Sequence, residues 1–175
     1  MVSIIVAKMD ASSLIRAKKI DIIDLIKKLY GGIIITETVY EEAVEKGMRR
    51  GYRDAYELKK IIDKGVIKVI KASGLASFSL GRGEAEVIHE CIREKSEGKE
   101  VLFITDDNRS AKFAARKTID VLGIDMVLLE AVIRGVISEE YFMDKIEELV
   151  ELYPMDPSRL SMIFRILRII REGEK

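Results

Sequence analysis

Four stretches of the sequence place a carboxylate where a strand ends or where the next helix begins. Asp10 follows a short apolar run, and Asp106 and Asp107 follow another. Glu42 stands one and a half turns into a helix that follows a third run, and Glu84 opens the helix after a Gly-rich loop. The carboxyl ends of parallel strands share one edge of a sheet, where such sheets bind ligands and metals. We therefore expect Asp10, Glu42, Glu84 and Asp107 to converge in one cleft.

Carboxylates gathered in this way favour a bound cation. At about 4 Å, two of them in a partly buried site repel each other by several kcal/mol, and a divalent cation removes that penalty. The candidate donors are oxygens, which indicates Mg²⁺ or Mn²⁺ rather than zinc, because zinc usually recruits His or Cys. Such an ion activates a water and holds the oxygens of a phosphodiester during in-line displacement.

The elements that would position these acids alternate along the chain. We expect strands over residues 3–9, 33–35, 66–70, 101–105 and 119–122, and helices over residues 20–29, 37–46, 54–65, 84–95, 110–117, 125–134, 138–152 and 158–171. Thr36 and Asp54 are expected to cap the helices that follow them. Continuous apolar strands joined by helices predict an α/β fold, a three-layer α/β/α sandwich with a central, mainly parallel sheet. The first and fourth strands should lie near its centre.

The length of 175 residues suits one main domain. We assign residues 1–152 to the domain that carries the acids. Residues 153–175 are expected to form a C-terminal amphipathic helix, packed on that domain or at an interface, because Pro154 and Pro157 interrupt the chain before it. Its apolar stripe of Leu160, Ile163 and Leu167 predicts core packing, a dimer contact or a docking face for a regulatory partner.

Composition limits the classes of function. Acidic and basic side chains number 30 each, so any surface that attracts nucleic acid must be local. The single cysteine, Cys91, excludes an internal disulfide and agrees with a reducing cytoplasm. No run approaches the roughly 18 apolar residues of a membrane span, so we expect a cytoplasmic protein without membrane contact. The absence of Gln, the single Asn and the charged fraction of 34% are typical of a thermophile.

At its acidic segments the chain resembles the PIN-domain family of metal-dependent ribonucleases, in particular toxin-like and archaeal-type members. Residues 10–15, Asp-Ala-Ser-Ser-Leu-Ile, are similar to the family's opening Asp-x-Ser/Thr-x-Leu-Ile. Residues 35–42 resemble its strand-to-helix turn, in which a glutamate stands six residues after a Ser/Thr or Pro. Residues 80–88 resemble its third acidic motif, and residues 104–107 its Thr-x-Asp. The order and spacing of these segments extend the likeness over about residues 3–137, and Gly123 together with residues 128–137 also looks like the end of one PIN subgroup.

The resemblance implies catalytic roles for Asp10, Glu42, Glu84 and Asp107 as ligands of Mg²⁺ or Mn²⁺. Secondary candidates for the site are Ser12, Glu41, Glu86, Thr105, Asp106 and Asp125. The third acid of many members is Asp, whereas Glu84 and Glu86 compete here; we favour Glu84, which lies nearer the helix N-terminus. Asp106 is expected to cap the next helix or to support the site from outside. Asp125 stands where other members often have Thr.

By the same resemblance the protein would be an endoribonuclease that acts on single-stranded RNA, either as the toxin of a toxin–antitoxin pair or in RNA processing. An antitoxin and a homodimer are the partners expected besides RNA. The basic residues predicted to line the RNA path are Arg16, Lys19, Arg49, Arg50 and Lys112. The alternative for them is a merely solvated surface.

Other classes of α/β protein also carry acids at strand ends. A phosphotransferase of the haloacid-dehalogenase kind needs a second Asp two residues after the first, where Ser12 stands. A phospho-receiver ends its third strand with the phosphoacceptor Asp, whereas this chain has Lys71 there. A PIN-like or receiver-like module that binds without cleaving remains the alternative function. His89 and Cys91 are expected to be structural.

Overall fold

The computed structural model describes residues 5–77 and 79–173. Its contacts divide the chain into two compact units, Met1–Gly123 and Ile124–Lys175. Residues 3 and 4 of the first expected strand lie outside the described residues. The domain boundary expected at residue 152 stays a prediction, and the two units are described separately below.

The first unit is built on one parallel sheet of five strands in the order β3-β2-β1-β4-β5. These strands are β1 (Val6–Met9), β2 (Ile33–Thr36), β3 (Ile67–Ile70), β4 (Val101–Ile104) and β5 (Asp120–Leu122). Every neighbouring pair runs parallel. Each side chain of β4 is buried, which explains why its sequence is apolar without alternation. The predicted parallel sheet with its first strand at the centre and its fourth beside it is confirmed.

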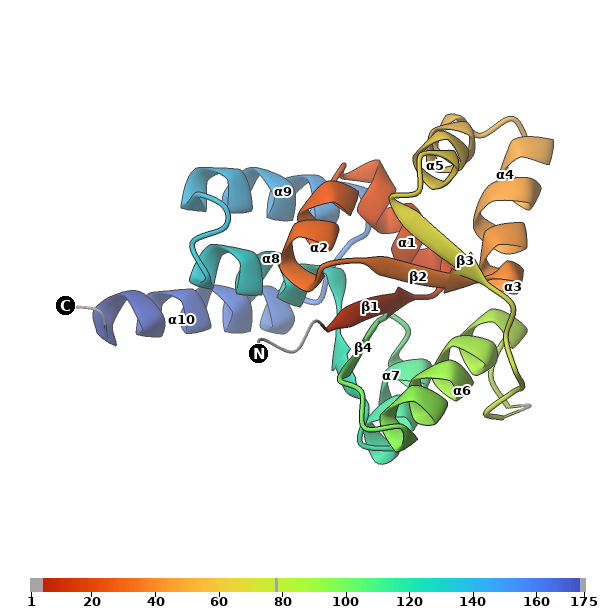
Figure 1. The fold of residues 1–175 in the computed structure, drawn as a ribbon. Helices are drawn as coiled ribbons and strands as arrows, with labels where there is room; N and C mark the ends of the chain where they lie inside the picture. Colours follow the sequence, from red (N-terminus) through yellow and green to blue (C-terminus); the bar gives the residue numbers. More distant parts are fainter. Residues whose placement is uncertain (1–4, 78, 174–175) are drawn as a thin grey trace. The chain divides into compact units, whose positions relative to one another are not determined.

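Helices cover both faces of this sheet (Figure 1). On one face lie α1 (Ala11–Lys19), α2 (Ile23–Tyr30) and α5 (Arg53–Asp63). On the other lie α6 (Arg82–Ser96) and α7 (Asn108–Arg116). The chain therefore leaves β1 toward one face and leaves the adjacent β4 toward the other. The expected three-layer sandwich is confirmed, and the space beyond the ends of β1 and β4 is its topological switch point.

The first helical region differs from the single helix expected over residues 20–29. Two helices, α1 and α2, replace it, because the Asp10 carboxylate accepts the Ser13 N–H and starts a helix immediately after β1. Asp21 separates the two helices with a φ of 57°, in the left-handed region where a right-handed helix cannot continue. The expectation missed α1 because serines close to a helix start also favour loops.

The helical region after β2 also differs from expectation. Thr36 does cap it, accepting the Val39 N–H, but the helix continues beyond residue 46 as α3 (Glu37–Tyr40), the π-helical segment η1 (Glu41–Glu45) and α4 (Lys46–Arg49). Gly47 does not end it. A Cβ on Gly47 would lie 2.6 Å from the Cβ of Ala55, so the glycine permits close packing of α4 against α5. Asp54 was wrongly expected to cap α5, whose N-cap is Tyr52.

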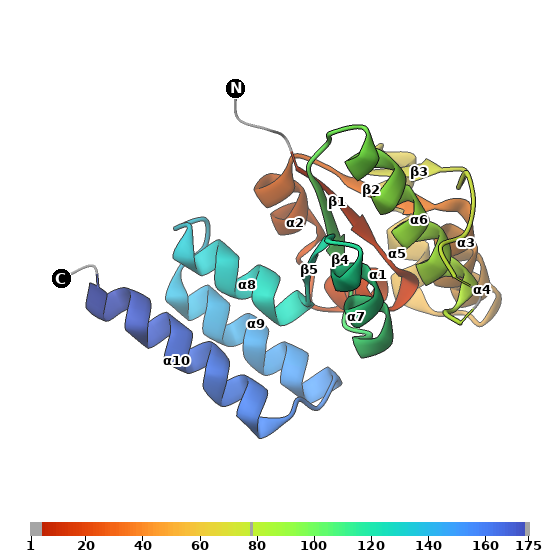
Figure 2. The same ribbon diagram turned by 90° about the horizontal axis from the view of Figure 1, so that it is seen from below.

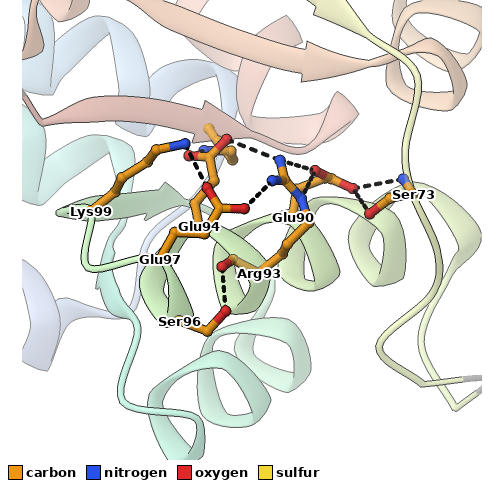
Figure 3. Close-up of polar contacts among 8 residues, drawn as sticks. Ser73, Glu90, Arg93, Glu94, Ser96, Glu97 and Lys99 are labelled. Atoms are coloured by element: carbon orange, nitrogen blue, oxygen red, sulfur yellow. Dashed lines mark hydrogen bonds and ion pairs between the residues drawn. The ribbon is translucent and has the colours of Figure 1, made fainter.

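A buried lysine in the central strand was not foreseen. Lys8 is 1% exposed, and its Nζ lies 2.5 Å from the Glu94 carboxylate of α6. Figure 3 shows Arg93 between Glu90 and Glu94 on this helix, and Glu90 also accepts bonds from the N–H and hydroxyl of Ser73. Burial alone would raise the pKa of Glu90, but the bonds from Ser73 and Arg93 outweigh it and lower that pKa. A paired charge network thus joins β1, α6 and the loop after β3.

The second unit consists of α8 (Ile124–Ile133), α9 (Glu139–Leu152) and α10 (Pro157–Gly173), which lie side by side in Figure 2. Ser138 begins α9 as expected, accepting the Tyr141 N–H. Ile163 and Leu167 of the predicted apolar stripe are buried, and α10 contacts α8. Within residues 5–77 and 79–173, no helix combines the length and apolarity that crossing a bilayer requires.

Candidate active site

The two aspartates that end β1 and β4 are brought together by strand register. Met9 pairs with Ile104 in the parallel ladder, so Asp10 and Thr105 come next to each other one residue beyond it. Both residues are buried, and the Thr105 hydroxyl donates a hydrogen bond to Oδ2 of Asp10. The same hydroxyl accepts the N–H of Asp107 at 3.1 Å. Thr105 therefore links the two predicted ligands, a role that agrees with its place among the secondary candidates.

Each of these aspartates also caps a helix. Oδ1 of Asp10 accepts the N–H of Ser13 at 2.8 Å and the hydroxyl of Ser12 at 3.1 Å. Oδ1 of Asp107 accepts the N–H of Ser110 at 2.7 Å. The bond from the Ser110 N–H lowers the pKa of Asp107, which keeps this exposed carboxylate ionised. Capping and ligation do not exclude each other, because a carboxylate has two oxygens and about four lone-pair sites.

The expectation that Asp106 caps α7 is wrong, because Asp107 holds that position. Asp106 instead accepts a bond from Nη1 of Arg16 at 3.2 Å, and its own N–H donates to the Ser13 hydroxyl at 3.1 Å. Asp106 thus joins the segment after β4 to α1. Its alternative role, support of the site from outside, agrees with this geometry.

The two glutamates form the other half of the candidate site. Glu42 lies in η1 and is half-buried, and Glu84 lies in the first turn of α6. Burial raises the pKa of Glu42, and repulsion by the Glu84 carboxylate raises it further, against a smaller opposite effect of Lys46. Glu41 and Glu86 add to the same repulsion. This cluster therefore has an excess of negative charge that a cation would offset.

Two glycines at the start of α6, Gly81 at its N-cap and Gly83 in its first turn, make room for these glutamates, a role that sequence reasoning did not assign to them. A Cβ on Gly83 would lie 2.8 Å from Oε2 of Glu42, and a Cβ on Gly81 would meet the Glu84 carboxylate. Arg109, just after Asp107, donates to the Ser79 carbonyl at 2.6 Å and so ties α7 to the loop that leads to Gly81. The signal in the sequence was the Gly-x-Gly directly before Glu84.

The remaining acidic candidates differ in their surroundings. Glu86 is buried at 6% exposure and accepts a bond from Arg82 at 2.9 Å, whereas Glu41 is exposed on η1. Asp125 is buried in the second unit, where both of its oxygens accept bonds from Arg159. Its role in the site stays a prediction.

The basic residues predicted for an RNA path have three different surroundings: ion pairs, a pocket and an exposed helix surface. Arg16 pairs with Asp106, and Arg49 pairs with Glu45. Lys19 and Arg50 line a pocket that Glu42 also lines. Lys112 is exposed on α7.

The donor chemistry suits a hard divalent cation, because it consists of four carboxylates and the Thr105 hydroxyl, all of them oxygen donors. Among residues 5–77 and 79–173, no three His, Cys, Asp or Glu side chains form a group that could hold a metal ion. The described acids are thus arranged as an aspartate pair, linked through Thr105, and a glutamate pair, linked by repulsion.

The protein is an α/β protein whose parallel sheet carries acids at its carboxyl edge, where sheets of this kind bind ligands and metals. The chain belongs to the PIN-domain family, since a model of the DUF3368 family of PIN domains matches residues 5–153. PIN domains are generally nucleases and typically use divalent metals.

One solved structure with a similar fold is a PilT N-terminus domain protein, SSO1118, from the hyperthermophilic archaeon Sulfolobus solfataricus P2. Its TM-score is 0.53 at 18% sequence identity, over 73% of this chain and 93% of that one. Among curated protein sequences, none matches the chain significantly. The resemblance to the PIN family inferred from the acidic motifs is confirmed.

Proposed function

We propose that this PIN domain is an endoribonuclease that hydrolyses phosphodiester bonds in single-stranded RNA and depends on Mg²⁺ or Mn²⁺. The observation that carries the proposal is the buried Asp10, joined through the Thr105 hydroxyl to Asp107 at the switch point of the sheet. A buried carboxylate is costly unless hydrogen bonds or an ion satisfy it, and the three hydrogen bonds to Asp10 leave lone-pair capacity for an ion. Buried and ionisable groups at a ligand-binding edge mark functional sites.

Asp10, Glu42, Glu84 and Asp107 are the residues that would hold the ion. When bound, the ion would supply a nucleophilic water at neutral pH and would stabilise negative charge on the phosphate. The hydrogen bonds of Asp10 to Ser12, Ser13 and Thr105 hold its carboxylate in one orientation before any ligand arrives.

The glutamate pair has a different task in this proposal. A bound cation would relieve the repulsion between Glu42 and Glu84 without protonating either carboxylate, so this pair would contribute to the affinity for the ion. We favour Glu84 over Glu86 as the ligand, because Glu84 is the stronger of the two in raising the pKa of Glu42, and Arg82 already neutralises Glu86.

An antitoxin partner and a homodimer stay predictions from the sequence. Exposed apolar side chains of the second unit, such as Leu152, Met162 and Ile169, are the kind of surface that either contact would use.

The test compares wild type with Asp10→Asn in cleavage of labelled single-stranded RNA, with Mn²⁺ or with excess EDTA. We expect EDTA to abolish cleavage and Asp10→Asn to reduce it by at least about 100-fold. The fold should survive, because asparagine retains an oxygen that caps α1. Circular dichroism and thermal unfolding provide the control for folding.

Undiminished cleavage in EDTA would refute the metal requirement. Mn²⁺ binding by calorimetry without any cleavage of RNA would instead identify a binding module, the alternative function.

A further inference from the structure

A pocket of about 230 Å³ lies beside the glutamate half of the site. Its walls come from α1, η1, α4 and the start of α5, and Glu42 is one of the residues that line it. Pockets that enclose whole drug-sized ligands are larger, roughly 300–1,000 Å³. This pocket therefore suits one unit of a longer ligand whose neighbouring part reaches the acids.

Three cations line the pocket from two sides. Lys19 comes from α1, whereas Lys46 and Arg50 come from α4 and the residue that follows it. The other arginines of this region have acidic partners, Glu45 for Arg49 and Glu57 for Arg53. Within the described residues 5–77 and 79–173, no ion pair engages Arg50. An arginine that lines a pocket without an acidic partner is a donor available to a phosphate.

Tyr52 adds an aromatic wall. Its side chain is 53% exposed although it lines the pocket, and its N–H donates to the Gly47 carbonyl at 3.0 Å. A Cβ on Gly47 would lie 3.9 Å from Cδ2 of Tyr52, so the ring lies over this glycine. A half-exposed ring beside cations is the combination that binds single-stranded nucleic acid, since the bases stack on the ring and the phosphates meet the charges.

Two carboxylates, Glu42 and Asp54, also line the pocket. They repel a phosphate from their own side and so direct it toward Lys19 and Arg50. Duplex nucleic acid would not use such a pocket, because its bases are stacked on one another and cannot reach the ring.

We infer that this pocket binds one nucleotide of single-stranded RNA, its base against Tyr52 and its phosphate at Arg50 and Lys19, next to the phosphate that reaches the acids. The inference rests on the proposed function for the position of the scissile phosphate. The binding itself requires no metal and is tested separately.

The experiment measures fluorescence anisotropy of a labelled single-stranded RNA in EDTA, with the whole chain. Tyr52→Ala and Arg50→Ala are compared with matched controls outside the pocket, Tyr56→Ala and Arg53→Ala. Tyr56 is 44% exposed on α5, and the Arg53 side chain is 92% exposed. All four changes are at surface positions, and thermal unfolding checks that each variant folds.

We expect each pocket variant to weaken RNA binding about tenfold, since stacking or a phosphate contact is lost, and each control to stay within about twofold. Arg50→Ala should also reduce the slope of log affinity against log salt by about one. Tyr52→Phe should bind almost as wild type, because the ring remains.

Several results would overturn the inference. The first is wild type that does not bind single-stranded RNA, and the second is wild type that binds duplex RNA equally well. The variants of Arg50 and Arg53 could lose affinity equally, which would indicate only diffuse attraction. Cleavage measured in parallel with Mn²⁺ separates the two claims. If wild type cleaves RNA but the pocket variants bind RNA as tightly as wild type, only the inference about the pocket is refuted. If wild type binds RNA through the pocket but does not cleave it, the proposed nuclease activity is refuted.

Discussion

The aspartate half and the glutamate half of the candidate site are built on opposite principles. Asp10 and Asp107 receive hydrogen bonds from helix N-termini and share the Thr105 hydroxyl, and the pKa of Asp107 is lowered. Glu42 is pushed toward its neutral form by burial and by Glu84. The aspartate half has its carboxylates stabilised by hydrogen bonds without a ligand, whereas the glutamate half keeps a repulsion between its carboxylates.

The difference shows how a chain can prepare an anionic site without losing its fold. Strand register and helix capping, which are needed for folding in any case, position the aspartates. The glutamates are instead accommodated by the absent side chains of Gly81 and Gly83 and by a π-helical turn, a feature often found at functional sites. Rigid ligands would set the position of the ion, and repelling ligands would set its affinity.

The largest expected loss of RNA cleavage tests the assignment of the aspartate half. Asp107→Asn should lower RNA cleavage about 100-fold, because an anionic ligand is lost while the cap of α7 remains. Asp106→Asn should lower it by no more than about threefold, because the contacts of Asp106 with Arg16 and Ser13 join it to α1. Initial rates with Mn²⁺ provide the measurement. Equal losses in the two variants would contradict the assignment of Asp107 alone as ligand.

A moderate effect should separate the two candidates in the glutamate half. Glu84→Gln is expected to weaken Mn²⁺ binding about tenfold or more, whereas Glu86→Gln should change it less, because Arg82 already neutralises Glu86. Isothermal titration with Mn²⁺ decides between them. The reverse order of the two affinities would make Glu86 the ligand.

The smallest effect concerns stability without metal. The pKa of Glu42 is higher in the folded state than in the unfolded state. Ionisation of Glu42 therefore costs more in the folded protein, and this lowers the free energy of unfolding at any pH above the unfolded-state pKa, pH 7 included. Glu42→Gln should therefore raise the melting temperature by roughly 1–3 °C, a small gain because solvent screens a half-exposed carboxylate. The gain should vanish below the ordinary glutamate range, where Glu42 is protonated in both states.

Asp107→Asn provides the matched opposite case. In wild type the pKa of Asp107 is lower in the folded state than in the unfolded state. The Asp107 carboxylate therefore stabilises the fold at pH values above its unfolded-state pKa, and this stabilisation is lost as the pH falls through the folded-state pKa. At pH 7 this variant should melt slightly below wild type in thermal scans with EDTA. Shifts of the same sign in both variants would mean that the two halves do not differ in electrostatics.

Much of this architecture could be predicted from local sequence. The apolar runs before Asp10 and Asp107 indicated buried parallel strands, and side-chain type indicated the caps at Thr36 and Ser138. Placement of acids at strand ends follows from the same runs. These features depend on neighbours in the chain, which is why patterns reveal them.

Other features depend on residues far apart or on backbone detail. The partner of Lys8 lies 86 positions away, so no spacing rule could pair it with Glu94. The extra residue of η1 alters the helical period around Glu42, which an amphipathic pattern cannot show. Which of Asp106 and Asp107 caps α7 was decided by contacts of Asp106 with α1, again nonlocal.

The buried Cys91 of α6 makes local opening of the first unit measurable by thiol labelling. Its side chain is fully buried, and burial raises the pKa of the thiol to about 12, so the reactive thiolate is scarce in the folded protein. It is the only cysteine in the chain, so a thiol reagent would report a single event. The rate of labelling then measures how often α6 leaves the sheet, the same helix that carries Glu84.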